Sequence, residues 1–244
     1  MRTIHIYQPG TYQLHDAVLL SEGASHHVSR VLRMRTNDAL TLFCGDNHTY
    51  SARIIAIQKH WVTVRIEGVR FANRESPCII HLAQGIAKKE QMAFIIQKAV
   101  ELGVASITPV ITQHCTIKLD ANQLAKRYTQ WESIAVGACE QSGRNKLPVI
   151  HPPCHFETYL AQNTTPYRYL LDPKSETNFR DGIQDHTPGE ISLLIGPEGG
   201  LHPEEISNAR AAKFQGISLG PRILRTETAT LTALSVLQAF LGDL

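Results

Sequence analysis

The sequence predicts an α/β fold in two parts, a small β-barrel followed by a domain with a mostly parallel sheet and helices on its faces. Strand patterns dominate residues 1–72, whereas strand and helix patterns alternate over residues 73–244. A polar stretch ending at Pro77 separates the region of strand patterns from the region in which strand and helix patterns alternate. We therefore expect a barrel domain over 1–72 and an α/β domain over 73–244.

Strand signals come first along the chain. Runs rich in β-branched and aromatic residues predict strands at Thr3–Tyr7, Ala39–Phe43, Tyr50–Ile55 and Trp61–Ile66. Turn residues separate them, and one helix is expected at about residues 21–34. Short antiparallel strands at this spacing favour a small barrel.

From Cys78 onward the elements alternate. The predicted strands are Cys78–Leu82, Ser106–Val110, Arg168–Leu171, Glu190–Ile195 and Gly216–Leu219, and the predicted helices are Lys88–Leu102, one from about Asn122, and Ala229–Leu241. This order indicates a mostly parallel sheet. Because ligands bind beyond the carboxyl ends of such strands, the loops that begin after Leu171, Ile195 and Leu219 form the candidate site.

Composition is that of an ordinary soluble globular protein, with 43% hydrophobic and 19% charged residues. No apolar run reaches about 18 residues, and no basic segment precedes an apolar one at the N-terminus. We therefore expect a cytoplasmic protein with no membrane partner.

Five cysteines are scattered along the chain and never occur as C-x-x-C, which indicates reduced thiols. Cys154 and His155 follow His151, but two prolines intervene and no second ligand pair follows at zinc spacing. We expect a loop at this position and no metal ion.

The densest basic stretch is Ser25–Arg35, which contains Arg30, Arg33 and Arg35, although the formal net charge of the chain is only +2. Such a patch suits phosphate groups, and a solvated helix face explains it equally well on charge alone.

The loop Gly196-Pro197-Glu198-Gly199-Gly200 joins a strand to a helix, as phosphate-binding loops do. It lacks a lysine, loses one N–H at Pro197, and carries a negative charge at Glu198, so a nucleoside phosphate is a poor ligand. A cationic nucleoside without phosphate suits it better, and S-adenosylmethionine fits that description. A tight turn with Glu198 at the surface is the alternative.

A second polar glycine loop follows the last predicted strand. Arg225-Thr226-Glu227-Thr228 places a cation, hydroxyls and a carboxylate before a broad apolar helix that is suited to burial and to a partner subunit. The simpler interpretation is a local ion pair between Arg225 and Glu227, with Thr226 capping the helix. Two such loops at neighbouring strand ends favour a binding site.

These residues also carry a family resemblance. Leu194–Gly200 and Leu219–Ala229 strongly resemble the ribosomal RNA small subunit methyltransferase E family. Four further segments match this family: Val31–Arg35, Arg74–Pro77, Ile96–Gly103 and Ala138–Asn145. The resemblance therefore spans essentially the whole chain.

The resemblance implies a SPOUT-class enzyme that methylates N3 of a uridine in 16S ribosomal RNA of the small ribosomal subunit, with S-adenosylmethionine as methyl donor. It also implies a PUA-like barrel, a deep trefoil knot, which no packing rule would propose, and a homodimer that acts on the assembled 30S subunit. The residues that it assigns to the cofactor are Leu171, Gly196, Glu198, Gly199, Gly200, Leu219, Gly220, Ile223, Leu224 and Thr228. One local departure is His202 before Pro203, where a better cap such as serine is expected.

Uracil N3 carries a proton and is a poor nucleophile until that proton leaves or the developing charge is stabilised. We expect Arg225 to stabilise charge on a uracil oxygen or to position the base, and Glu198 to accept the N3 proton or to orient Arg225. The predicted RNA contacts are Arg30, Arg33, Arg35, Arg74, Arg144 and Asn145, with a dimer contact as the alternative for Arg144.

Two other functions fit the same sequence. A different SPOUT RNA methyltransferase, including one that modifies ribose 2′-OH, would share the cofactor loops. A noncatalytic RNA-binding ribosome assembly factor on this fold would lack affinity for S-adenosylmethionine.

Overall fold

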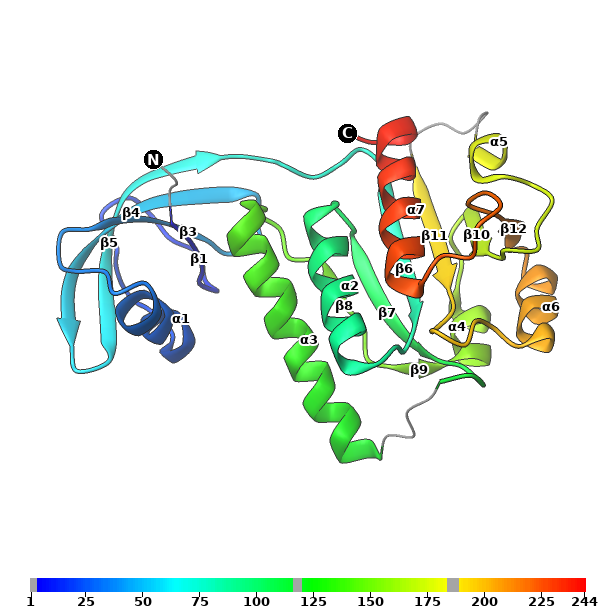
Figure 1. Cartoon of the computed structure of the whole chain (residues 1–244). Coiled ribbons are helices and arrows are strands. Elements are labelled where there is room, and N and C mark those ends of the chain that lie inside the picture. Colours follow the sequence, from blue (N-terminus) through cyan, green and yellow to red (C-terminus); the bar gives the residue numbers. More distant parts are fainter. Residues whose placement is uncertain (1–3, 116–119, 184–188) are drawn as a thin grey trace. The chain divides into compact units, whose positions relative to one another are not determined.

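The structure is a computed structural model that describes residues 4–115, 120–183 and 189–244 (Figure 1). The chain forms two compact units, the first made of residues 1–75 with 139–147 and the second of 76–138 with 148–244. The segment 139–147, which the sequence placed within the second domain, thus clusters with the first unit. The N-terminal residue of the strand predicted at Thr3–Tyr7 lies outside the described residues.

The first unit contains a five-stranded sheet in the order β1-β3-β4-β5-β2. The strands are β1 (His5–Tyr7), β2 (Ala17–Leu19), β3 (Ala39–Phe43), β4 (His48–Gln58) and β5 (Trp61–Phe71). All pairings are antiparallel except that of β1 with β3, which is parallel. Closure of this sheet into a barrel stays a prediction.

The helix predicted at about 21–34 is shorter in the structure. α1 (Glu22–His26) begins after Ser21, whose hydroxyl accepts a hydrogen bond from the Ala24 amide, and passes into one π-helical turn, His27–Val31. Arg33 has φ of 53°, a left-handed conformation that ends helical structure.

The second unit contains a sheet in which every described pairing is parallel. Its strand order is β12-β10-β11-β6-β7-β8, and β9 also pairs with β7. The strands are β6 (Ile79–Gly85), β7 (Ser106–Ile111), β8 (Val149–Ile150), β9 (Cys154–His155), β10 (Tyr167–Leu171), β11 (Glu190–Ile195) and β12 (Gln215–Ile217). The loop expected at Cys154 and His155 is therefore wrong, since both residues pair with β7.

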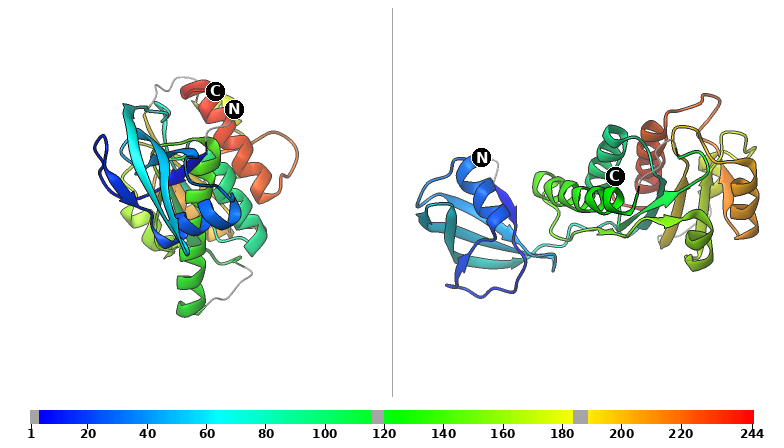
Figure 2. Two further views of the ribbon diagram at one scale, coloured as in Figure 1. Left: turned by 90° about the vertical axis from the view of Figure 1, so that its left-hand side faces the viewer. Right: turned by 90° about the horizontal axis from the view of Figure 1, so that it is seen from below.

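Helices cover both faces of this sheet, as Figures 1 and 2 show. α4 (Phe156–Gln162) and α6 (Pro203–Ala211) pack on one face, where Ala83, Leu170 and Leu194 lie in one apolar cluster with residues of both helices. α2 (Lys89–Glu101) and α7 (Thr226–Leu241) pack against each other, and α7 contacts β11. Burial on both faces explains why β11 is mostly apolar after Glu190, with Ser192 as its buried polar side chain.

Two further helices complete the fold. α3 (Ala121–Ser142) is the long helix predicted from about Asn122, and α5 (Phe179–Ile183) is a short helix that the sequence did not predict. The C-terminal helix begins at Thr226, three residues earlier than predicted, so that its first turn belongs to the candidate site. The trefoil knot stays a prediction.

Within the first unit, His5 gives a testable pH dependence. Burial and the nearby Arg74 guanidinium lower the pKa of His5 from 6.5 to about 4. The unfolded chain therefore binds this proton more readily, and the stabilisation present above pH 6.5 is lost as the pH falls toward 4. The full shift at pH 5 corresponds to about 2 kcal/mol, and we expect about 1 kcal/mol because the ring is partly exposed to solvent.

The measurement is urea unfolding at pH 7 and pH 5, followed by Trp61 fluorescence in a Trp131→Phe background so that only the first unit is reported. His5→Gln, whose side chain does not titrate, should lose about 1 kcal/mol less stability than the parent chain over this interval. Equal pH dependence in both chains would contradict the assignment.

Candidate functional site

The candidate site lies at the carboxyl ends of four neighbouring strands. Because β12, β10, β11 and β6 are adjacent and parallel, the loops that follow them meet at one edge of the sheet. A small cavity of about 40 Å³ opens among these loops. It is lined by Leu171, Asp172, Pro173, Ile217, Ser218, Leu219, Gly220, Arg222, Leu224 and Ala229.

The loop after β11 packs closely against the end of β6. A Cβ atom on Gly85 would lie only 2.5 Å from Pro197 Cδ and 2.6 Å from Pro197 N, so only glycine allows this approach. Gly200 has φ of +70° and completes the turn, with its amide donating to the Pro197 carbonyl at 2.9 Å. The glycines thus serve close backbone packing as well as the turn.

Gln84 links three parts of the site and was not predicted from the sequence. Its side chain is fully buried, and Nε2 lies 3.2 Å from the Gly196 carbonyl and 3.0 Å from Thr226 Oγ1. Thr226 Oγ1 donates to the Gly196 carbonyl at 2.7 Å, and Thr230 Oγ1 donates to Gln84 Oε1 at 2.8 Å. This buried network fixes the loop after β11 to the start of α7. The sequence signal that could have indicated Gln84 is its position as a polar residue near the end of the mostly apolar strand β6.

Glu198 contacts the beginning of α2. Its Oε1 accepts a hydrogen bond at 2.9 Å from the backbone N–H of Lys88, the residue that precedes the first turn of α2. A carboxylate at a helix N-terminus is stabilised by the unsatisfied N–H groups and by the helix dipole. The geometry therefore favours a role in holding the loop.

The loop is also held from its other side. His114 Nδ1 lies 3.0 Å from the Gly199 carbonyl, and Glu205 accepts hydrogen bonds from the amides of Gln113 (2.9 Å) and His202 (2.8 Å). His202 caps α6, because its Nδ1 accepts from the Glu204 amide at 3.3 Å, and Glu205 completes a capping box. The expectation of a poor cap at His202 is therefore wrong.

Arg225 is the N-cap residue of α7 and has an exposed side chain. Among the described residues no ion pair joins it to Glu227. Thr226 is the first residue of α7, and its hydroxyl bonds to Gly196 instead of capping the helix. The simpler interpretation, an Arg225–Glu227 ion pair with Thr226 as the cap, therefore does not describe this loop. The Arg225 guanidinium is available to a ligand.

The predicted cofactor residues divide into three groups. Leu171, Leu219, Gly220 and Leu224 line the cavity, whereas Gly196, Glu198, Gly199 and Gly200 form the adjoining loop. Ile223 and Thr228 are exposed and do not line the cavity; Ile223 is 87% exposed.

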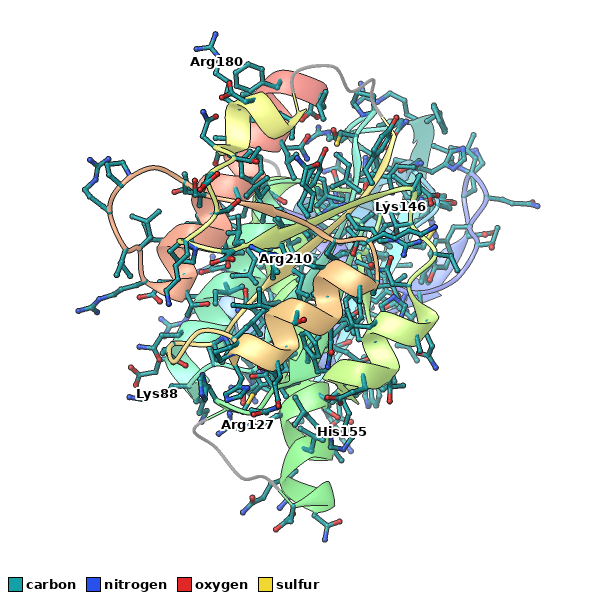
Figure 3. The ribbon with its side chains drawn as sticks, turned by 90° about the vertical axis from the view of Figure 1, so that its right-hand side faces the viewer. Lys88, Arg127, Lys146, His155, Arg180 and Arg210 are labelled. Atoms are coloured by element: carbon teal, nitrogen blue, oxygen red, sulfur yellow. The ribbon has the colours of Figure 1, made fainter. Side chains whose placement is uncertain are left out.

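Asp172 lies at one of the three strand ends that the sequence indicates as the candidate site, although it is not among the predicted cofactor residues. It is buried directly after β10, and its Oδ2 accepts a hydrogen bond at 2.9 Å from Arg210. Arg210, which is labelled in Figure 3, belongs to α6. Its Oδ1 accepts from the Lys174 amide at 3.0 Å. The carboxylate therefore fixes the loop that forms one wall of the cavity.

Four of the predicted RNA contacts are arginines of residues 1–75, in the first unit. Arg30, Arg33, Arg35 and Arg74 have exposed side chains. Arg30 Nη2 lies 3.1 Å from His60 Nδ1, and the Arg35 amide donates to Asp38. These arginines remain candidates for RNA phosphate contacts.

Arg144 and Asn145 lie in a different environment from the other predicted RNA contacts. Arg144 is 5% exposed and forms two hydrogen bonds to the Glu75 carboxylate, at 3.0 and 2.5 Å. Asn145 is fully buried, and its Nδ2 donates to the Ala72 carbonyl at 2.6 Å. Because both side chains are buried and donate to groups of the first unit, we propose that they hold the segment 139–147 within that unit. Their predicted contact with RNA stays an untested prediction.

A larger cavity of about 660 Å³ lies at the opposite, amino-terminal ends of the strands. Its lining includes His81, Ser106 and Glu190, near the beginnings of β6, β7 and β11. His81 Nδ1 lies 2.8 Å from Ser106 Oγ, and burial lowers the pKa of His81. None of the predicted site residues lines this cavity.

Over the part of the chain that the structure describes, no helix is long and apolar enough to cross a membrane. Within the same residues, no group of three or more His, Cys, Asp or Glu side chains is arranged to hold a metal ion.

Comparison with known families places this geometry in context. Residues 74–238 match a family described as an RNA methyltransferase domain, and residues 20–67 match one described as an RNA methyltransferase PUA domain. The protein named Ribosomal RNA small subunit methyltransferase E of Buchnera aphidicola subsp. Schizaphis graminum (strain Sg) is 36% identical over 243 residues. The alignment covers 100% of this chain and 98% of that protein.

Solved structures agree with this relationship. A Legionella pneumophila protein, determined in complex with the bound cofactor SAM, is 47% identical, with a TM-score of 0.96 and coverage of 100% of both chains. Ribosomal RNA small subunit methyltransferase E from Neisseria gonorrhoeae, bound to S-adenosyl methionine, is 35% identical, with a TM-score of 0.90 and coverage of 99% of both chains. The chain therefore belongs to the ribosomal RNA small subunit methyltransferase E family, with an α/β RNA methyltransferase domain and an N-terminal PUA-like domain.

Proposed function

We propose that this protein transfers the methyl group of S-adenosylmethionine to N3 of a specific uridine in 16S ribosomal RNA. The observation that carries the proposal is the meeting of the loops after β10, β11 and β12 at one edge of the sheet, in a chain that aligns over its full length with two proteins solved with this cofactor. The same edge presents the exposed cation Arg225.

The residues at this edge fit a nucleoside without phosphate. The cavity is lined by apolar side chains such as Leu171, Leu219 and Leu224, which suit the faces of an adenine ring. This cavity is partly open and measures about 40 Å³, below the ~300 Å³ of the smallest usual ligand pockets, so a nucleoside would extend beyond it along the adjoining loops. When bound, the sulfonium supplies an electrophilic methyl group.

This chain's own residues then have to position uracil and stabilise charge on it. As N3 loses its proton, negative charge develops on the two carbonyl oxygens of uracil. We assign Arg225 to donating hydrogen bonds to one of these oxygens, because its guanidinium is exposed beside the cofactor loops. Positioning the ring in line with the methyl group supplies the rest of the rate.

We assign Glu198 to holding the loop rather than to accepting the N3 proton. Glu198→Gln keeps an oxygen that can accept from the Lys88 amide, so kcat should remain within about threefold of wild type between pH 6 and 9. Glu198→Ala removes the acceptor, and the loss of about 1 kcal/mol should weaken cofactor binding by roughly fivefold. Single-turnover methyl transfer and calorimetry measure the two quantities. A hundredfold loss of kcat in Glu198→Gln would restore the proton-acceptor role.

The function itself is tested by mass mapping of ribosomal RNA from cells with and without the gene. We expect one uridine of 16S ribosomal RNA to be lighter by about 14 mass units when the gene is absent, which is the mass of the CH₂ that methylation adds. Restoration by the purified protein with S-adenosylmethionine, on naked RNA or on 30S subunits, identifies the substrate form. We propose the assembled 30S subunit, in the cytoplasm.

The two alternatives have separate outcomes. Nuclease products that carry the methyl group on ribose would identify a 2′-OH methyltransferase on the same fold. Absence of S-adenosylmethionine binding in calorimetry, together with retained RNA binding, would identify a noncatalytic assembly factor.

We also propose that the protein works as a homodimer through α2 and α7. These helices pack together, and they expose Phe94 and Phe240, which are 43% and 56% exposed. Large apolar side chains on neighbouring helices suit an interface between subunits. Light scattering should give a dimer mass for the wild type and a monomer mass for Phe240→Glu.

A further inference from the structure

We infer that Lys88, Arg222 and Arg225 form a cationic rim at the edge of the cofactor loops and bind RNA phosphates on either side of the target nucleotide. This inference rests on the proposed function, because it takes the substrate to be RNA. It adds a second RNA-binding surface, in the methyltransferase domain, to the arginines of the PUA-like domain.

The first observation is how Lys88 is held in place. Its backbone N–H donates to Glu198 Oε1 at 2.9 Å, which fixes its backbone beside the loop 196–200. Its side chain is exposed, and Figure 3 shows Lys88 at the molecular edge beside the loop that precedes α6. The exposed side chain of Lys88 therefore starts from a backbone position that is fixed by the hydrogen bond to Glu198.

The second observation is that the other two cations occupy the same edge. Arg222 lines the cavity between the ends of β10 and β12, and Arg225 directly precedes Thr226, which is bonded to the end of β11. Lys88 follows β6. Since β12 and β6 are separated by three strand spacings of ~4.8 Å, the rim spans roughly 14 Å. This width exceeds one nucleotide and suits binding to several phosphates.

The third observation is that these three cations, like several other exposed Lys and Arg side chains of the described residues, form no ion pair within the chain and so keep their charge available to a ligand. Arg53, Lys98, Arg144 and Arg210 each pair with a carboxylate of this chain. Among the described residues, no such ion pair includes Lys88, Arg222 or Arg225, although Glu198 and Glu227 lie close in sequence or space. The Glu198 carboxylate is directed instead to the start of α2.

An RNA strand would satisfy this arrangement. Phosphates are the groups that proteins contact most often in nucleic-acid complexes, and they fix register while the base is read elsewhere. Exposed cations on the rim would hold the backbone, so that the target base can enter between the cofactor loops. The rim therefore acts in RNA binding and orientation, and Arg225 also reaches the base.

The experiment measures binding of small-subunit ribosomal RNA transcribed in vitro, by fluorescence anisotropy from 50 to 300 mM KCl. The slope of log Kobs against log salt concentration is negative. Its magnitude should decrease by about 0.7 for each phosphate of single-stranded RNA that a variant no longer neutralises. We expect this decrease for Lys88→Gln, and about twice the decrease for Lys88→Gln with Arg222→Gln. Lys88→Gln keeps the backbone N–H, so its Kd for S-adenosylmethionine should equal that of the wild type.

Lys126→Gln is the matched control, since Lys126 is an exposed lysine on α3 and its replacement changes net charge equally. We expect its slope to match that of the wild type. An unchanged slope in Lys88→Gln, in a protein that still methylates ribosomal RNA, would overturn the rim and leave the proposed function intact. A wild-type protein that does not methylate the RNA would instead contradict the proposed function.

Discussion

Arg225→Ala is expected to lower kcat by about 10²- to 10³-fold while the Kd for S-adenosylmethionine stays within about threefold of the wild-type value. The physical reason is that a preorganised donor aimed at developing charge contributes mainly in the transition state. The cavity is lined by residues on both sides of Arg225 but not by Arg225 itself, so the affinity for the cofactor should change little. Single-turnover methyl transfer under saturating RNA gives kcat, and calorimetry gives the cofactor affinity.

Arg225→Lys and Arg180→Ala complete this test. Lysine keeps the charge but lacks the planar fork, so we expect an intermediate loss of roughly tenfold. Arg180 is an exposed arginine of α5 outside the rim, and its replacement should leave kcat unchanged. Unchanged turnover in Arg225→Ala with cofactor binding intact would contradict the assignment of Arg225 to charge stabilisation.

The elements of the sheet were predictable where burial leaves a local pattern. β11 was predicted with its observed bounds, Glu190–Ile195, because burial of every residue after Glu190 gives a mostly apolar segment, in which Ser192 is the one polar side chain. The helix predicted at Lys88–Leu102 was confirmed within one residue at each end, because its buried side chains recur at three- and four-residue steps. In contrast, the three-residue strand β2 and the two-residue strands β8 and β9 are too short to show a period.

The meeting of the candidate loops at one edge of the sheet was also predictable, but the hydrogen bonds among them were not. Glycine-rich loops after neighbouring parallel strands identify an edge of the sheet from sequence alone. The partners of Gln84 lie 112 and 142 residues away, at Gly196 and Thr226, and nothing local indicates them. Likewise, Glu198 accepts from an amide 110 residues away, which no charge pattern could reveal.

Arg144 shows why the role of a residue within a recognised motif is hard to predict from sequence alone. Arginine is rarely buried, so a sequence that places Arg144 after a helix favours a surface position and an RNA contact. Its partner Glu75 is 69 residues away, within another matching segment, and the pairing becomes evident only in the folded chain. Glu75 and Arg144, one from each segment, form a buried ion pair that links the two segments.

Arg144→Ala is therefore expected to destabilise the first unit by about 3 kcal/mol, at the lower end of the cost of removing one partner from a buried pair. The side chains of Arg144 and Glu75 are only 6% and 19% exposed, so the remaining carboxylate would lack a compensating charge away from bulk water. Urea unfolding followed by Trp61 fluorescence in a Trp131→Phe background reports this unit separately, because the two units need not unfold together.

Arg53→Ala supplies the comparison that makes this result interpretable. Arg53 also forms two hydrogen bonds to one glutamate, Glu67, but these side chains are 45% and 43% exposed. An exposed pair of the same chemistry should contribute much less to stability, because solvent and salt screen it. If Arg144→Ala costs as little as Arg53→Ala, and lowers the salt dependence of RNA binding, then Arg144 contacts RNA as the sequence first indicated. A large decrease in stability, with the salt dependence retained in the folded variant, assigns the arginine to the architecture of the PUA-like domain.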